Sequence, residues 1–150
     1  MTEVLFYHLD RQPLERVLPV LLEKSVERGW RVVVEAATAE RVEALDNLLW
    51  TYADDSFLPH GTDREPDAER QPVLLTSGPA RANGATVRFL VDGAGFPDDL
   101  ASYQRIVVLF DGHDPDAVEG ARAQWKAARA AGHACTYWQQ GETGRWERKA

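Results

Sequence analysis

The feature that most constrains this chain is an alternation of short apolar, β-branched runs with longer stretches of helical period. Residues 4–9, 31–35 and 105–110 are such runs. Short, continuously apolar runs are typical of strands that are buried on both faces of a parallel sheet. Amphipathic stretches separate them, as crossover helices would. The alternation predicts an α/β domain of three layers, with a mostly parallel central sheet flanked by helices.

The local signals place most of the elements. Helices are expected from Pro13 to Gly29, from Thr38 through Trp50, and from Asp114 to about residue 131. Pro19 lies inside the first of these, where we expect a kink or an early break. Strands are expected at residues 4–9, 31–35, 73–76, 86–92, 105–110 and 134–139.

The remaining segments lack periodicity. With 150 residues the chain has the length of one domain, so residues 1–150 are expected to fold as a single α/β unit. Residues 51–71 are expected to form a long irregular loop, and residues 140–150 a polar C-terminal tail that contains Trp146.

Composition excludes several classes of function. The chain has 24 acidic and 17 basic residues, a formal charge of −7, which argues against a protein that coats DNA or RNA. Cys135 is the only cysteine, so neither an intrachain disulfide nor a multi-cysteine zinc site is possible. We find no secretory signal and no apolar run of the roughly 20 residues that span a membrane. A cytoplasmic protein without membrane contact is expected.

The phosphate-binding and nucleophile motifs of α/β enzymes are missing. The chain has no GxxxxGK[ST] loop and no G-x-S-x-G elbow. Gly93-Ala94-Gly95 lacks the third glycine of a dinucleotide fingerprint and is better explained as a turn. The four histidines show no metal-ligand spacing. No cofactor and no metal are therefore expected.

Three carboxylates support one enzymatic alternative. Glu35, Asp92 and Asp111 each fall at the predicted carboxyl end of a strand. That edge is where doubly wound sheets bind ligands, and converging carboxylates can hold Mg²⁺ for phosphoester hydrolysis. Acids also end strands simply because they start turns and cap helices, and this explanation is favoured. The alternative function is a metal-dependent phosphoesterase.

The helix that starts at Asp114 carries the most informative pattern. At about 100° per residue, one face gathers apolar residues suited to packing on the sheet: Ala117, Val118, Ala121, Trp125 and Ala128. Arg122, Lys126 and Arg129 follow the adjoining edge. A cationic row beside an indole could receive a peptide that ends in an aromatic residue and a free carboxylate. From the pattern alone, a solvated basic face beside a core tryptophan is the favoured explanation.

A second candidate surface combines residues 49–52 with residues 56–60, Ser-Phe-Leu-Pro-His. Aromatic residues at a helix exit can fold back to cover the helix, or they can anchor another protein. For Phe57 both explanations stay open. Trp50 is expected to be in the core.

These residues also carry a family resemblance. Phe6-Tyr7-His8-Leu9, the block from Leu49-Trp50 to Ser56-Phe57-Leu58-Pro59-His60, and the block from Ala121-Arg122 through Trp125-Lys126 and Arg129 to Gly132-His133 occur in family order. Together with Arg31–Val34, Leu45-Asp46 and Gln71-Pro72-Val73 they cover nearly the whole chain. In these motifs the sequence resembles the chi subunit of bacterial DNA polymerase III, a clamp-loader accessory protein.

The resemblance implies a Rossmann-like fold and a non-catalytic replisome adaptor. Family members bind the acidic, Phe-terminated C-terminal tail of single-stranded-DNA-binding protein (SSB) and the psi subunit of the clamp loader, so contact with DNA is indirect. Carried over by motif, the tail-binding residues are Arg122, Trp125 and Lys126, and Phe57 belongs to the psi-facing surface. Arg129 joins the tail site through its helical spacing. The implied location is the cytoplasm, at the replisome on the nucleoid.

Two positions depart from the best-known family pattern. A tyrosine of the family is Trp125 here, and a basic residue one turn before Arg122 is Val118. The shorter cationic row is expected to weaken the tail contact unless another arginine compensates for it. The candidates for compensation are Arg105, Arg145 and Arg148.

Overall fold

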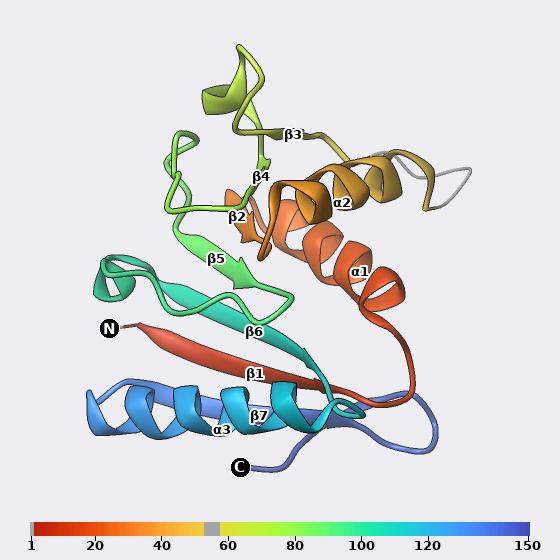
Figure 1. The fold of residues 1–150 in the computed structure, drawn as a ribbon, viewed down its shortest axis with the longest axis vertical. Coiled ribbons are helices and arrows are strands. Elements are labelled where there is room, and N and C mark those ends of the chain that lie inside the picture. Colours follow the sequence, from red (N-terminus) through yellow and green to blue (C-terminus); the bar gives the residue numbers. More distant parts are fainter. Residues whose placement is uncertain (1, 53–57) are drawn as a thin grey trace.

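The structure is a computed structural model that describes residues 2–52 and 58–150. Its centre is an eight-stranded sheet in the order β3-β4-β2-β5-β6-β1-β7-β8 (Figure 1). The pairs are parallel except β7 with β8, which is antiparallel. The strands are β1 (Glu3–Leu9), β2 (Val32–Glu35), β3 (His60–Thr62), β4 (Val73–Thr76), β5 (Val87–Leu90), β6 (Arg105–Asp111), β7 (Ala134–Gln140) and β8 (Trp146–Arg148).

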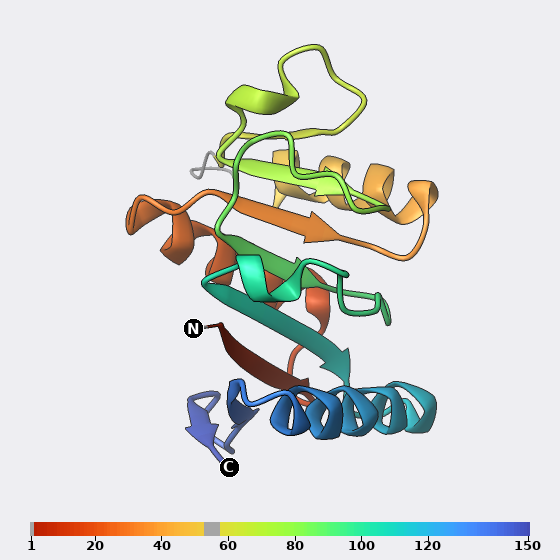
Figure 2. The ribbon, with the colours of Figure 1, turned by 90° about the vertical axis from the view of Figure 1, so that its left-hand side faces the viewer.

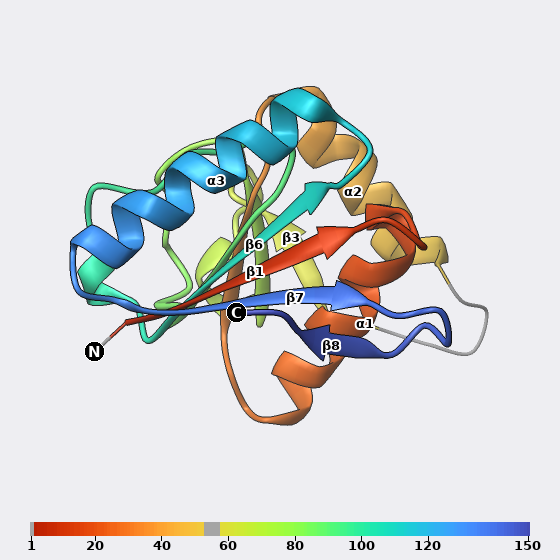
Figure 3. The same ribbon diagram turned by 90° about the horizontal axis from the view of Figure 1, so that it is seen from below.

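Helices cover both faces of this sheet. α3 (Pro115–Ala130) lies on one face, whereas α1 (Leu14–Glu27) and α2 (Ala39–Thr51) lie on the other (Figures 2 and 3). Two short 3₁₀ turns, η1 (Ala68–Arg70) and η2 (Leu100–Ser102), lie in the connections. The predicted α/β fold with a mostly parallel sheet is confirmed.

The core divides into two apolar layers because successive strand residues point to opposite faces. Val32 and Val34 of β2 pack with Leu18 and Leu22 of α1. On the other face, the aromatic ring of Phe6 in β1 packs against the α3 residues Ala121 and Ala128. These layers hold α3 rigidly across β1, β6 and β7, and this position determines where its exposed residues lie.

The helix ends follow the local signals, with one exception. α1 runs through Pro19 without the predicted break. Pro19 is buried, and packing of its ring offsets the one amide hydrogen bond that it cannot donate. At the other end of α1, Gly29 adopts a φ of 80° and Trp30 donates its backbone amide to the Ser25 carbonyl, a Schellman closure.

Two segments hold more structure than their sequence indicated. Residues 51–71 were expected to be irregular, yet β3 pairs with β4 inside this segment and η1 follows it. The polar tail contains β8, which pairs with β7. The prediction of an irregular loop is therefore wrong for residues 60–62 and 68–70, since three-residue strands are too short to show a period.

No helix in the described part of the chain combines the length and the apolar character needed to cross a membrane.

Candidate functional site

The predicted cationic row lies on the exposed side of α3. The Asp114 side chain accepts a hydrogen bond from the Asp116 amide at 3.0 Å, so the helix begins with a capped first turn. Ala121 and Ala128 are buried against the sheet, while Arg122, Lys126 and Arg129 are exposed. The structure thus confirms the predicted packing face and the exposure of the three cations.

An apolar notch opens beside Arg122. It has a volume of about 210 Å³ between α3 and the strands below it. Its lining residues are Phe110, Val118, Ala121, Arg122, Trp125, Tyr137 and Ala150. Val118, the residue that shortens the cationic row, therefore contributes to an apolar wall.

Trp125 forms a rigid side of this notch. Its indole meets the ring of Phe6 edge to face at a centroid distance of 5.4 Å and the ring of Tyr137 at 6.1 Å. The Arg129 guanidinium lies 5.7 Å from the centre of the Trp125 ring, within cation–π distance. Because Trp125 is half-buried, one part of the ring packs in the core and another part faces the notch.

The cations of the row form no ion pair with the residues that the structure describes. Among residues 2–52 and 58–150, the ion pairs within 4.0 Å involve other side chains and leave out Arg122, Lys126 and Arg129. A chain of net charge −7 therefore presents, along one helix edge, three cations that have no ion-pair partner in the described part of the chain. Such an edge attracts carboxylates of a partner.

A part-buried hydrogen bond holds Tyr137, one of the lining residues of the notch. His8 Nδ1 and the Tyr137 hydroxyl are 2.6 Å apart, a hydrogen bond between β1 and β7. Burial raises the pKa of Tyr137, with the Arg122 charge acting in the opposite direction. Burial also lowers the pKa of His8, against the nearby Asp10 carboxylate. Both rings are therefore uncharged at neutral pH, so Tyr137 presents a neutral ring to the notch.

The sequence analysis did not identify Phe110 and Tyr137 as site residues. The signal was present, because alternation places Tyr137 on the same face as Cys135, and both pack in the α3 layer. Strand order was the missing information. Only the pairing of β1 with both β6 and β7 brings Phe110 and Tyr137 together under α3.

Two of the arginines that could compensate for the shorter cationic row project from the face of the sheet opposite α3. Arg105 pairs with Glu3 at 3.6 Å and lies over the Trp30 ring, on the α1 side of the sheet. Arg148 is the cross-strand neighbour of Trp138, which stacks on Tyr7 on that same side. Arg105 therefore cannot extend the row on α3, whereas the Arg148 guanidinium donates at 2.8 Å to the oxygen of Ala150, a residue that lines the notch.

The second candidate surface is described only in part. Phe57 lies outside the described residues. Trp50 was expected in the core, but 54% of its surface is exposed and its ring lies against His60 at a centroid distance of 4.6 Å. That expectation was wrong because Leu45 and Leu49 supply the buried stripe of α2, and Trp50 lies one position around the helix from Leu49.

The three carboxylates of the enzymatic alternative each have another partner. Glu35 pairs with Arg88, whose guanidinium donates to it at 2.5 and 3.1 Å. Asp92 accepts two hydrogen bonds from Arg41, and Asp111 accepts one from the His113 amide. Across the described residues, no group of three or more His, Cys, Asp or Glu side chains could hold a metal ion. The geometry does not favour the phosphoesterase.

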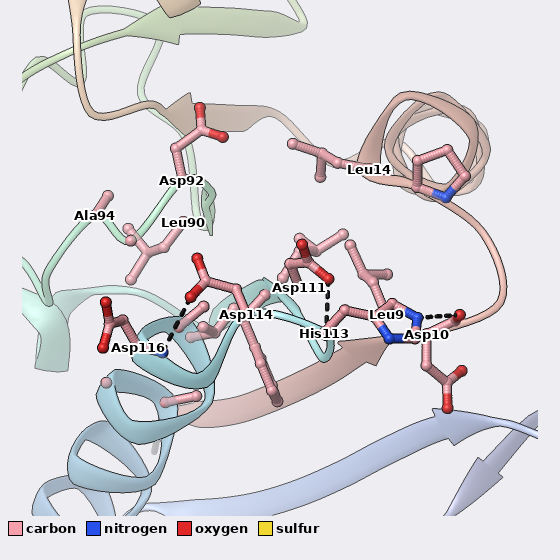
Figure 4. A pocket seen from close by; sticks show the side chains of 18 of the residues that line it. Leu9, Asp10, Leu14, Leu90, Asp92, Ala94, Asp111, His113, Asp114 and Asp116 are labelled. Atoms are coloured by element: carbon pink, nitrogen blue, oxygen red, sulfur yellow. Dashed lines mark hydrogen bonds between the residues drawn. The ribbon is translucent and has the colours of Figure 1, made fainter.

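A larger cleft of about 990 Å³ lies at the carboxyl ends of β1, β5 and β6. Figure 4 shows Asp10, Asp92, Asp111 and Asp114 around it: Asp10 follows β1, Asp92 follows β5, Asp111 ends β6, and Asp114 lies in the connection from β6 to α3. The Asp114 carboxylate caps α3 by accepting a hydrogen bond from the Asp116 amide. Asp92 and Asp111 line this cleft, whereas Glu35 does not. The three carboxylates therefore do not share one site.

Comparison with known proteins points to one family. A family model described as the DNA polymerase III chi subunit, HolC, matches residues 1–136. The DNA polymerase III subunit chi of Pseudomonas aeruginosa is 28% identical over 138 residues, which cover 89% of this chain and 93% of the relative. A probable DNA polymerase III subunit chi of Rickettsia prowazekii is 25% identical over 121 residues, 74% of this chain and 71% of the relative.

Proposed function

Because the chain belongs to the DNA polymerase III chi subunit family, whose members are non-catalytic accessory subunits, we propose that it is an adaptor for the SSB tail. In this role it binds the acidic, Phe-terminated C-terminal tail of SSB along the edge of α3. It thereby connects SSB to the clamp loader of the DNA polymerase III holoenzyme.

One observation carries the proposal: an apolar notch on α3 adjoins a row of cations that have no ion-pair partner among residues 2–52 and 58–150. The notch of about 210 Å³ is lined by rings and methyl groups and has Arg122 at its rim. A cavity of roughly 150 Å³ suffices for a benzene ring. A terminal phenylalanine thus fits the notch, with its carboxylate within the field of Arg122.

The remaining cations match the acidic residues that precede that phenylalanine. Lys126 lies one turn beyond Arg122 on the same edge, and Arg129 lies against Trp125. Charge-assisted hydrogen bonds between such groups and carboxylates are stronger than neutral ones. The direction of α3 supports a tail that enters along Arg129 and Lys126 and ends in the notch.

The psi subunit is proposed as the second partner. This proposal rests on the family membership and on the segment that contains Phe57, which carries the resemblance. The exposed Trp50 adjoins that segment in sequence and lies at the opposite end of the sheet from β8. The two proposed partners therefore attach to well-separated parts of the domain.

The proposed function is tested by calorimetric titration with a synthetic SSB tail peptide. The wild type is expected to bind the peptide, more weakly as salt is raised. A peptide without its terminal phenylalanine is expected to lose binding. Arg122→Ala combined with Lys126→Ala is expected to weaken it at least about tenfold, since hydrogen bonds to charged groups contribute about 1.5–3 kcal/mol.

A matched variant separates this site from general charge. Arg64→Ala combined with Arg70→Ala removes two exposed arginines beside β3 and η1, far from α3, and is expected to bind normally. Equal loss of affinity in both double variants would contradict a site on α3.

A further inference from the structure

A second aromatic and basic surface lies on the face of the sheet opposite α3. Four half-buried rings follow it, and we refer to them as the aromatic strip: Tyr7, Trp30, Trp138 and Trp146. The tail-binding site uses none of them. Trp138 and Trp146 also lie beyond residues 1–136, the part that matches the family model.

Three of the rings form one cluster across β1, β7 and β8. Tyr7 stacks on Trp138 with centroids 6.4 Å apart and planes inclined by 17°, and it meets Trp146 edge to face at 4.9 Å. Tyr7 and Trp138 are direct neighbours in the pairing of β1 with β7. Figure 3 shows these strands with α3 on one side and α1 on the other.

The fourth ring, Trp30, stands between two arginines. The Arg105 guanidinium lies 4.6 Å from its centre and the Arg28 guanidinium 5.1 Å from it. Both arginines also act on Tyr7, since their charges oppose the rise in the Tyr7 pKa that burial causes. The indole thus positions two cations next to the strip before any partner arrives, and this lowers the entropy lost on binding.

One further cation on this side of the molecule, Lys24, borders the strip. Lys24 and Arg28 are exposed and four residues apart on α1, so they lie within about 40° of each other around the helix. Glu15 and Glu23 lie on the other flank, where they contact Arg41 and Tyr52 of the α2 side.

On β8, Arg148 is the cross-strand neighbour of Trp138. The Glu147–Lys149 pair belongs to the opposite face of this strand, because strand residues alternate. Of the strip cations, Arg105 pairs with Glu3 at 3.6 Å, and Arg148 Nε donates to the oxygen of Ala150 at 2.8 Å. Among the described residues, Glu3 is the one acidic side chain within ion-pair distance of these four cations, on a chain whose net charge is −7.

We propose that the aromatic strip and its cations, Lys24, Arg28, Arg105 and Arg148, bind single-stranded nucleic acid. Bases stack on the exposed parts of the rings, and phosphates pair with the cations. Several rings interleaved with cations match the repeating base and phosphate of a single strand, and such stacking is tolerant of sequence. A duplex conceals its base faces and would leave the rings unused.

Fluorescence anisotropy with a labelled oligo-dT of about 16 nucleotides tests the proposal on the intact chain. Binding is expected at low salt. Lys24→Ala combined with Arg28→Ala is expected to weaken it and to reduce the slope of log K against log salt by about 1.4, because each phosphate contact to a single strand contributes about 0.7.

Stacking is tested separately. Trp146→Ala is expected to weaken binding about tenfold, and Trp146→Phe to retain most of it, because a phenyl ring still stacks. The Arg64→Ala, Arg70→Ala variant and the Arg122→Ala, Lys126→Ala variant are expected to bind like the wild type. Urea unfolding of each variant establishes that it is folded.

Three results would overturn the proposal: no binding at low salt, equal competition by a duplex or by an acidic peptide without aromatic residues, or loss of binding in the Arg122→Ala, Lys126→Ala variant. None of the measurements uses the SSB tail. Failure here therefore leaves the proposed function standing, and failure of the tail titration leaves the strip standing.

Discussion

The indole of Trp125 meets the phenyl ring of Phe6 edge to face, with centroids 5.4 Å apart and planes inclined by 66°. Phe6 is fully buried in β1, an interior strand between β6 and β7, so this contact fixes a half-buried residue of α3 to the sheet. The notch beside Trp125 is therefore formed before a partner binds. A preformed notch reduces the ordering that recognition requires.

The apolar wall of the notch is tested at Val118. Val118→Asp places a carboxylate where the terminal phenylalanine ring is expected, and should weaken the SSB tail peptide about tenfold or more through lost apolar contact and charge repulsion. Ala123→Asp is the control, since it adds the same charge at an exposed position of α3 that does not line the notch. Similar affinities of the two variants in a peptide titration would place the phenylalanine elsewhere.

The ion pair of Glu35 and Arg88 is expected to be structural. Arg88 is fully buried, and its guanidinium also donates to the Tyr103 hydroxyl and to the carbonyls of Gly78 and Ala80. Glu35→Ala leaves this charge without its carboxylate and should lower the free energy of unfolding by about 3 kcal/mol. Urea denaturation measures the loss. A variant as stable as the wild type would mean that Glu35 is free for another role.

The pKa of His8 predicts a pH dependence of stability. Burial lowers this pKa below the value of about 6.5 that the unfolded chain shows. Below about pH 6.5 the unfolded state therefore binds more protons than the folded state, and stability falls as the pH is lowered. Urea denaturation between about pH 7 and pH 5 should show a smaller decline for His8→Gln than for the wild type. Parallel curves would contradict the shift.

Replacing each of two glycines in or next to α3 by alanine is expected to change the stability of the fold in opposite directions. Gly132 adopts a φ of 87° just beyond the helix, so Gly132→Ala should destabilise the fold by roughly 1–2 kcal/mol. Gly120 lies inside α3, and a Cβ atom there would meet nothing within 4 Å. Gly120→Ala should therefore stabilise the fold by up to about 1 kcal/mol. Thermal denaturation that showed the same sign for both variants would contradict this explanation.

Most of the fold could be predicted from local patterns. The continuous run Arg31–Glu35 and the Asp114-Pro115 start both identify their elements, because burial on two faces and helix capping act within a few residues. β3 and β8 could not be predicted in this way. Each has three residues and forms through pairing with a neighbour that only the tertiary fold supplies.

In the candidate site, too, one part could be predicted from local patterns and another part depends on the tertiary fold. Helical spacing alone places Arg122, Lys126 and Arg129 on one exposed edge of α3. The notch depends on Phe110 and Tyr137, whose strands flank β1 only because of the strand order. Arg105 shows the converse: its charge is evident in the sequence, but the face on which it acts is set by its pairing with Glu3 and its contact with Trp30.

The central claim is that the edge of α3 and the notch receive the SSB tail, and a chemical-shift map of the labelled protein with the tail peptide tests it most directly. We expect the largest changes at Arg122, the Trp125 indole and Tyr137, with smaller ones at Lys126 and Arg129. Changes centred instead on the cleft of Figure 4, or on the segment beside Trp50 while α3 stays unperturbed, would contradict the claim.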